Sequence, residues 1–182
     1  MRKFMWIMAL IVAAALPARA QNTPQVEIMG GYSYLRADMG GADLGIHGWR
    51  GSLTENVNHW LGGTADFSGY YTHVTPASGP PDINVNTHMF LFGPQFSRRK
   101  SQSFTPFTHV LFGVMHASQG YLGISQPKTD FAMALGGGFD LKIHKNIAIR
   151  LIQADYIYTP YLNQRQDNIR LSTGIVLRFG EK

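Results

Sequence analysis

One group of residues in this chain has the side chains of a hydrolytic site. His116 and Ser118 are separated by a single residue, and Asp130 follows further along the chain. A serine activated by a histidine and a carboxylate can attack an ester carbonyl. Such a triad is defined by geometry, however, and two neighbouring residues of these types arise easily in a chain with seven histidines. The sequence therefore predicts no catalytic residue, and an enzyme remains the alternative.

Other residue types that carry chemistry give no stronger pattern. The chain has no cysteine, which excludes disulfides, thiolate catalysis and cysteine-bound zinc. Its histidines form no HExxH or comparable arrangement, so neither a metal nor a cofactor is predicted. His88 and His109 are expected to be packed or hydrogen-bonded within strands. Gly136-Gly137-Gly138 lacks the Lys-Ser/Thr ending of a phosphate-binding loop, and is expected to allow strand bending or close backbone approach.

Charged and apolar residues alternate in the last extended segment, 168–179. One face carries Ile169, Leu171, Thr173, Ile175, Leu177 and Phe179, and the other carries Asn168, Arg170, Ser172, Gly174, Val176 and Arg178. A closed sheet with its apolar row towards lipid and its polar row inside bonds every backbone group within a bilayer. The same parity over the whole chain gives the candidate lumenal network Glu27, Arg50, Asp66, Asp140, Arg150, Arg170 and Arg178. Unpaired ions there would cost several kcal/mol each, so these side chains are expected to bond to one another.

The elements that would hold this network are strands, which makes the fold class all-β: an eight-stranded antiparallel up-and-down transmembrane β-barrel. The predicted strands are Val26–Leu35, Leu44–Thr54, Trp60–Tyr71, Val85–Ser97, Phe104–Ala117, Thr129–Lys142, Ile147–Tyr158 and Ile169–Phe179. The connections alternate between tight, polar turns and longer segments rich in Gly, Pro, Asn and Ser. The longer ones are 36–43, 72–84, 118–128 and 159–168. Short inner turns and longer outer loops are typical of bacterial outer-membrane barrels.

Two segments break the alternation between polar and apolar residues. In the seventh predicted strand, Leu151 would share a face with Gln153 and Asp155, which predicts a β-bulge at Leu151–Ile152. Segments 89–92 and 110–112 are apolar on both faces, so part of the interior should be packed with apolar side chains.

Prolines and aromatic residues give further expectations about the strands. Pro94 and Pro106 are expected to mark strand ends, because a closed sheet has no free edge for a missing donor. The aromatic residues Trp49, Trp60, Tyr70, Tyr71, Tyr156, Tyr158 and Phe179 are expected in girdles at the two membrane surfaces.

The N-terminus has the pattern of an export signal. Arg2 and Lys3 precede an apolar run over 4–16, and Ala18-Arg19-Ala20 supplies small residues before a cleavage position. Residues 1–20 are therefore predicted as a signal peptide and residues 21–182 as one barrel domain. The formal charge of +5 falls to +2 once Arg2, Lys3 and Arg19 are removed, so nucleic acid is not expected as a partner. The basic run 98–100 is expected to be a solvated connection.

Residues 24–180 resemble the eight-stranded outer-membrane β-barrel family, which includes the transmembrane domain of OmpA and OmpX-like proteins. The resemblance rests on the order and spacing of the segments 27–34, 48–53, 146–151 and 170–179. It implies a bacterial outer-membrane location, contact with outer-membrane lipid and lipopolysaccharide, and recognition of the C-terminal strand by the insertion machinery. Phe179 would be the recognised aromatic residue, although three residues follow it here.

For function, the resemblance implies a structural or surface-interaction protein without enzymatic activity, whose outer loops bind an unidentified extracellular ligand. A narrow, porin-like ion-conducting pore is one alternative. A second is a lipid A-modifying enzyme, because His116-Ala117-Ser118 has the spacing found in lipid A deacylase barrels, which carry Asn where this chain has Gln119. A third is a soluble barrel that carries a hydrophobic ligand, but the charged inward row of segment 168–179 opposes it.

Overall fold

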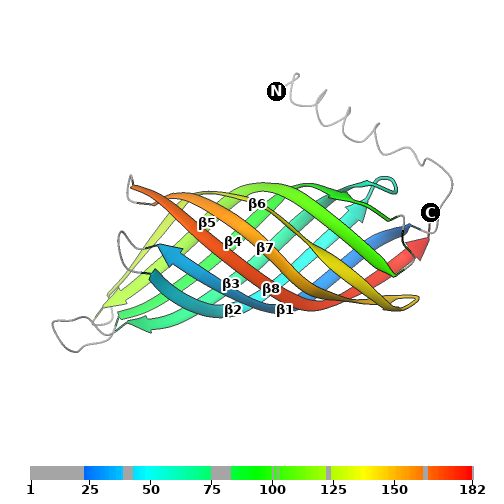
Figure 1. Ribbon diagram of the computed structural model, residues 1–182. Coiled ribbons are helices and arrows are strands. Elements are labelled where there is room, and N and C mark those ends of the chain that lie inside the picture. Colours follow the sequence, from blue (N-terminus) through cyan, green and yellow to red (C-terminus); the bar gives the residue numbers. More distant parts are fainter. Residues whose placement is uncertain are drawn as a thin grey trace, which may run out of the picture.

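The computed structural model describes residues 23–38, 43–74, 83–99, 101, 103–121, 124–161 and 164–181, and these form one closed antiparallel barrel (Figure 1). The eight strands are β1 (Pro24–Asp38), β2 (Asp43–Asn56), β3 (Leu61–Val74), β4 (Ile83–Ser97), β5 (Phe104–Tyr121), β6 (Ile124–His144), β7 (Ile147–Tyr161) and β8 (Gln164–Glu181). Each strand pairs with its neighbour in sequence, and β8 closes the barrel against β1. The predicted fold class is confirmed. Among the residues described, no helix has the length and apolar character needed to cross a membrane.

The two ends of the barrel differ. One end, called the turn end here, holds the start of β1, the end of β8, the connections 57–60 and 145–146, and residues 98–99, 101 and 103 between β4 and β5 (Figure 1). The opposite end is called the loop end. Loops were expected there at 118–128 and 159–168, and this expectation is wrong for most of their length. β5 and β6 remain paired up to Tyr121 and Ile124, and β7 and β8 up to Tyr161 and Gln164, because continued antiparallel bonding holds both hairpins extended. The connections 39–42, 75–82, 122–123 and 162–163 lie outside the described residues.

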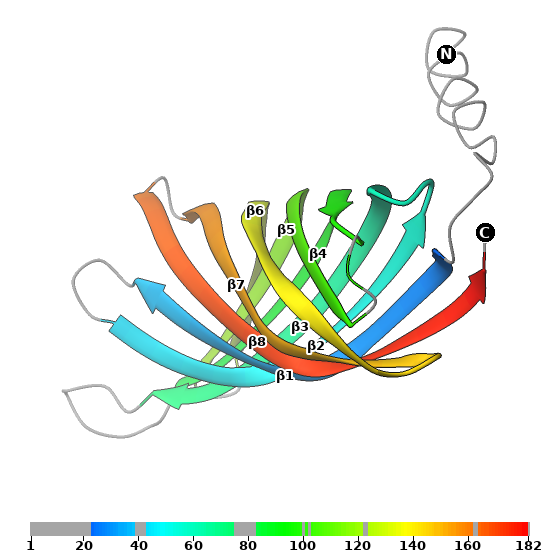
Figure 2. The ribbon, with the colours of Figure 1, turned by 45° about the vertical axis from the view of Figure 1, so that its right-hand side comes forward.

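Side chains alternate between the barrel interior and its outer surface. On β8, Arg170 and Ser172 are buried, whereas Ile169 and Ile175 are about half exposed. The outer surface is rich in apolar side chains on every strand, among them Ile28, Leu53, Phe67, Phe90, Phe112, Phe131, Ile152 and Ile175. The strands are strongly tilted around the barrel (Figure 2), and each of them carries part of this apolar surface. Such a surface suits a lipid environment and not water.

Aromatic residues lie at both ends of the outer surface as well as in its middle. Trp60, which was predicted to begin a strand, lies in the turn before β3 and stacks on Phe96, with ring centroids 6.0 Å apart. Near the loop end, Trp49 Nε1 lies 3.4 Å from the hydroxyl of Tyr71. Tyr70 is the exception to the predicted girdle, because its side chain is fully buried inside the barrel. There its hydroxyl is hydrogen-bonded to Ser33 Oγ at 2.8 Å.

The predicted bulge in β7 is confirmed. Arg150 pairs with Gly174 and Gln153 with Ser172, so that Leu151 and Ile152 together oppose one residue of β8. Both of these bulge side chains point outward, with exposed fractions of 49 % and 44 %. The bulge therefore resets the alternation, and the side chains of Gln153 and Asp155 enter the interior.

Pro94 and Pro106 do not mark strand ends, contrary to the sequence prediction. Pro94 lies inside β4, where the ladder to β5 has no pair at Gly93 or Pro94 but resumes in the same register at Gln95. Pro106 is the third residue of β5, and its carbonyl accepts a hydrogen bond of 2.9 Å from the Arg98 amide. The barrel thus tolerates both prolines near the turn end, because each omits only local ladder bonds.

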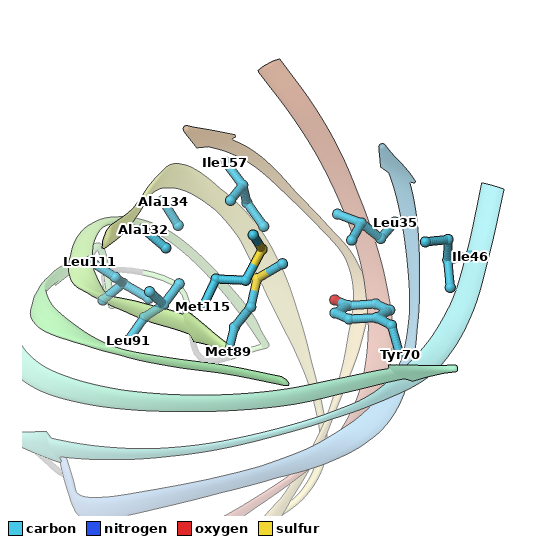
Figure 3. Packing of buried hydrophobic residues seen from close by; sticks show 10 residues of the cluster. All are labelled: Leu35, Ile46, Tyr70, Met89, Leu91, Leu111, Met115, Ala132, Ala134 and Ile157. Atoms are coloured by element: carbon cyan, nitrogen blue, oxygen red, sulfur yellow. The ribbon is translucent and has the colours of Figure 1, made fainter. Parts of the chain in front are cut away.

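Apolar side chains pack against one another inside the barrel (Figure 3). The cluster consists of Leu35, Ile46, Tyr70, Met89, Leu91, Leu111, Met115, Ala132, Ala134 and Ile157, all buried. This confirms the apolar interior packing predicted from segments 89–92 and 110–112. We call these residues the apolar plug.

Candidate lumenal ion network

Four charged side chains meet in the barrel interior and form what we call the central cluster: Arg50 of β2, Asp66 of β3, Asp155 of β7 and Arg170 of β8. Arg50 donates to Asp66 at 2.5 Å and to Asp155 at 3.0 Å. Arg170 donates to the same two carboxylates, each at 2.9 Å. Each ion therefore contacts two ions of opposite charge, and the cluster joins strands on opposite walls of the barrel. None of the four is more than 2 % exposed.

Asp155 is the most heavily bonded member of the central cluster. Besides both arginines, it lies 2.9 Å from His109 Nε2 and accepts hydrogen bonds of 3.0 and 3.1 Å from Gln153 Nε2. The list of lumenal candidates from the sequence omits Asp155, His109 and Gln153. Strict alternation from Ile147 places Asp155 on the outer face, and only the predicted bulge carried the signal that could have found it.

A glycine on β6 makes room for this carboxylate. Gly136 pairs with Asp155, and a Cβ at position 136 would lie 2.2 Å from Asp155 Oδ1. At Gly137 and Gly138 a Cβ would lie 2.4 and 2.3 Å from backbone oxygens of the neighbouring strands. The glycine run therefore serves close approach within the sheet, as the sequence indicated.

A second group of ions, the turn-end cluster, lies nearer the strand ends: Glu27, Arg99, Asp140, Arg150 and Arg178. Arg178 Nε donates to Glu27 at 2.8 Å, and Arg150 Nε donates to Asp140 at 2.8 Å. Arg178 also lies 3.5 Å from Asp140, which joins the two pairs. Arg150 further donates to Gln153 at 2.9 Å, and Gln153 connects this cluster to Asp155.

Arg99 corrects one prediction, because the basic run 98–100 is not simply a solvated connection. The Arg99 side chain points towards the barrel interior at the turn end, where Nη2 lies 2.9 Å from Glu27 Oε2 and 3.0 Å from Asn56 Oδ1. Its Nη1 donates to the carbonyl of His59 at 3.2 Å. Only Arg98 of the two described residues in this run is exposed. A turn residue therefore covers the lumenal carboxylate of Glu27 at the turn end.

All seven lumenal candidates from the sequence are buried in the interior. Arg50, Asp66 and Arg170 lie in the central cluster, and Glu27, Asp140, Arg150 and Arg178 in the turn-end cluster. The two clusters form a network of buried, mutually bonded side chains and not an open channel. Within the described ranges, no group of three or more His, Asp or Glu residues has a geometry that could hold a metal ion.

The candidate hydrolytic residues do not assemble into a triad. His116 and Ser118 share the outward parity of Phe112 and Val114, whereas Asp130 has the inward parity of Ala132 and Ala134. His116 Nδ1 instead lies 2.8 Å from Thr129 Oγ1, and Asp130 lies 3.2 Å from Lys128. The sheet itself thus separates the histidine from the proposed acid.

A closed antiparallel barrel with paired ions inside and apolar side chains outside defines the class of outer-membrane barrels. Residues 6–179 match the family described as outer membrane protein beta-barrel domain, and the chain belongs to this family. No curated protein sequence matches the chain significantly.

Solved structures give the same architecture. Neisserial surface protein A (NspA) is 14 % identical, with a TM-score of 0.71 over 88 % of this chain and 100 % of that one. Ail, the attachment invasion locus protein of Yersinia pestis, is 19 % identical, with a TM-score of 0.59 over 84 % and 97 %. The N-terminal β-barrel domain of Pseudomonas aeruginosa OprF is 10 % identical, with a TM-score of 0.53 over 86 % and 100 %. At these identities the likeness concerns the fold.

Proposed function

We propose that this chain is a non-enzymatic barrel of the bacterial outer membrane with a structural or surface-interaction role. Its N-terminal residues 1–20 act as the export signal, and the C-terminal strand with Phe179 is recognised by the insertion machinery. The loop end faces the cell exterior and the turn end faces the periplasm, in agreement with the asymmetry of such barrels.

The observation that carries this proposal is the filled interior. The central cluster consists of alternating, fully buried ion pairs, and the apolar plug lies beside it, because Leu91 pairs with Asp66 and Leu35 pairs with Arg170. An eight-stranded barrel is only wide enough for side chains to fill it. Its interior therefore fixes the strands in place, and interaction with partners falls to the loop end.

The partner at the loop end is an extracellular ligand. One neighbour, Ail, was solved in complex with the heparin analogue sucrose octasulfate, so a barrel of this fold can bind a polyanion. A ligand of this chain would contact the ends of the β1–β2, β3–β4, β5–β6 and β7–β8 hairpins.

Conductance in planar bilayers tests the closed barrel against the alternative of a narrow pore. The refolded protein should produce no stable current steps, while its gel band shifts on heating as an intact barrel does. Reproducible steps that disappear in Asp66→Asn would instead assign an ion path through the central cluster.

Lipid analysis tests the enzymatic alternative separately. Cells that express the wild-type protein or Ser118→Ala should have the same acyl pattern of lipid A. A change that requires Ser118 would overturn the non-enzymatic assignment.

A further inference from the structure

A patch of hydrogen-bonding side chains interrupts the apolar outer surface near the loop end of β3–β6. The patch consists of Tyr71, Asn86, His88, His116, Ser118 and Thr129, and we call it the headgroup patch. On each strand they lie on the same outward face as apolar residues nearer the turn end. Examples of these apolar residues are Phe67, Phe90, Val114 and Phe131. The residues of the headgroup patch therefore lie on the lipid-facing surface and not in the interior.

The register makes the headgroup patch continuous across these strands. His88 pairs directly with His116, and His116 pairs directly with Thr129. Asn86 pairs with Ser118, one step further towards the loop end. Directly opposed residues on one face of a sheet have Cβ atoms about 4.5–5.5 Å apart, so the two histidines are neighbours on the outer surface.

Each histidine uses one ring nitrogen within the protein. His88 Nε2 lies 3.2 Å from the Tyr71 hydroxyl, and His116 Nδ1 lies 2.8 Å from Thr129 Oγ1. Nδ1 of His88 and Nε2 of His116 have no hydrogen-bond partner within the part of the chain that the structure describes. Two histidines on adjacent strands are thus each held by a hydroxyl group, and each has a ring nitrogen left for an external partner.

The depth of the headgroup patch indicates what that partner is. A strand crosses the hydrocarbon layer in about 9–11 residues. We count this length from the stacked aromatic pair Trp60 and Phe96 at the turn end. On β3 it then extends from Leu61 to Tyr71, and on β4 from Phe96 to His88. The headgroup patch therefore begins where the hydrocarbon ends, at the level of lipid headgroups.

We propose that the headgroup patch binds the phosphate group of an outer-leaflet lipid, with His88 and His116 as the principal donors. This inference rests on the proposed outer-membrane location. Imidazole N–H groups and hydroxyls donate to phosphate oxygens, and an anionic oxygen forms stronger hydrogen bonds than a neutral one. Asn86 and Ser118 supply further polar groups on the side towards the loop end. The site is continuous with the apolar surface, which holds the acyl chains of the same lipid.

A pair of matched nanodiscs tests this site. One nanodisc contains phosphatidylcholine with lipid A that carries both phosphates, and the other contains dephosphorylated lipid A. The midpoint of the heat-induced gel shift is measured in each. For the wild type, phosphorylated lipid A should raise the midpoint by several degrees, because a ligand that binds only the folded state stabilises it.

The double variant His88→Phe, His116→Phe keeps two aromatic rings but removes their N–H donors. It should abolish most of the midpoint difference between the two nanodiscs. The control His59→Phe, His144→Phe changes exposed histidines of the turn end and should keep the full difference. An equal difference in all three proteins would overturn the site.

The source of the phosphate and the barrel itself are tested in the same series. Inorganic phosphate added to protein in zwitterionic micelles should leave the midpoint unchanged, and a rise equal to that caused by lipid A would overturn a lipid ligand. The heat shift itself reports the closed barrel. Loss of that shift in the wild type would contradict the proposed function, whereas loss of the lipid effect alone contradicts only this inference.

Discussion

Arg170 of β8 and Asp66 of β3 meet at 2.9 Å across the barrel interior, although 104 positions separate them in the sequence. Neither side chain has any exposed surface. Because Arg50 and Asp155 complete the central cluster, each charge is neutralised from two sides. Pairing on this scale allows guanidinium groups to be buried inside the barrel.

Removal of one carboxylate from this cluster should be costly. Asp66→Asn keeps the side-chain size but leaves Arg50 and Arg170 to share Asp155. Breaking a buried ion pair on one side typically costs about 3–5 kcal/mol, and we expect a loss of this size in the free energy of unfolding. Urea unfolding in lipid vesicles, followed by tryptophan fluorescence, measures it.

Two further variants separate charge balance from other effects of the substitution. Asp130→Asn alters the more exposed pair with Lys128 and should cost less than about 1 kcal/mol. The double variant Asp66→Asn, Arg170→Met restores the balance between Arg50 and Asp155, and should be more stable than Asp66→Asn alone. If the double variant were the less stable of the two, charge balance would not be the cause.

Gly136 provides a steric test of the same cluster. In Gly136→Ala the new methyl group would meet Asp155 Oδ1 at 2.2 Å and the Ala154 carbonyl at 2.4 Å. The carboxylate must then move away from its partners, and overpacking of this kind costs about 1–3 kcal/mol. Gly63→Ala is the matched control, because a Cβ added at this outward-facing position has no neighbouring atom within 4 Å. Equal unfolding free energies for the two variants would contradict this account of the glycine.

The barrel and most of its inward row follow from local rules. Alternation along β8 places Arg170 and Arg178 inside, and the same parity places Asp66 and Asp140 there. Such predictions succeed because a strand has a period of two and because lipid permits only one polarity outside. Strand ends were less predictable, since a polar hairpin can continue as paired strands beyond the membrane, as Ser118–Pro127 does.

Contacts between distant residues were out of reach for the sequence alone. Nothing in the basic run 98–100 distinguishes Arg99, which folds inward, from Arg98, which is exposed. The choice depends on the Glu27 carboxylate and the Asn56 amide on other strands. Asp155 was hidden for a different reason, because one bulge reverses the parity of the residues that follow it.

Arg99 should control access to the interior from the turn end. Asn56 is fully buried under this arginine, and the natural chain contains no cysteine, so Asn56→Cys can be labelled without background. In the Arg99→Ala background, a water-soluble maleimide should modify Cys at this position faster than in the Arg99 background. Truncation removes both the guanidinium that covers Glu27 and its hydrogen bond to the carbonyl of His59.

Arg98→Ala provides the control for this experiment, because it removes an equal charge from an exposed neighbour. Labelling in that background should match the protein with both arginines. Equal acceleration by Arg98→Ala would attribute the effect to net charge near the turn end and not to the side chain that covers Glu27.

The bulge in β7 makes a prediction about deletions. Leu151 and Ile152 both face outward and together oppose one residue of β8, so deletion of Leu151 leaves a regular strand in which Arg150 and Gln153 still point inward. At this site the bulge shifts the pairing of β7 with β6 and with β8 by one residue each. Without Leu151, both pairings therefore continue in one register here. The Leu151 deletion should therefore keep the heat-dependent gel shift of a closed barrel.

Deletion of Ala154 also shortens β7 by one residue, but it should abolish that gel shift. If the bulge stays, every residue beyond the deletion changes face, so that Asp155 faces lipid and the central cluster loses the carboxylate that both Arg50 and Arg170 contact. If the bulge is lost instead, Ile152 turns into the ion network and Gln153 turns towards lipid, which removes its hydrogen bonds to Arg150 and Asp155. A closed barrel after Ala154 deletion, or an unfolded chain after Leu151 deletion, would show that the parity set by the bulge does not determine assembly.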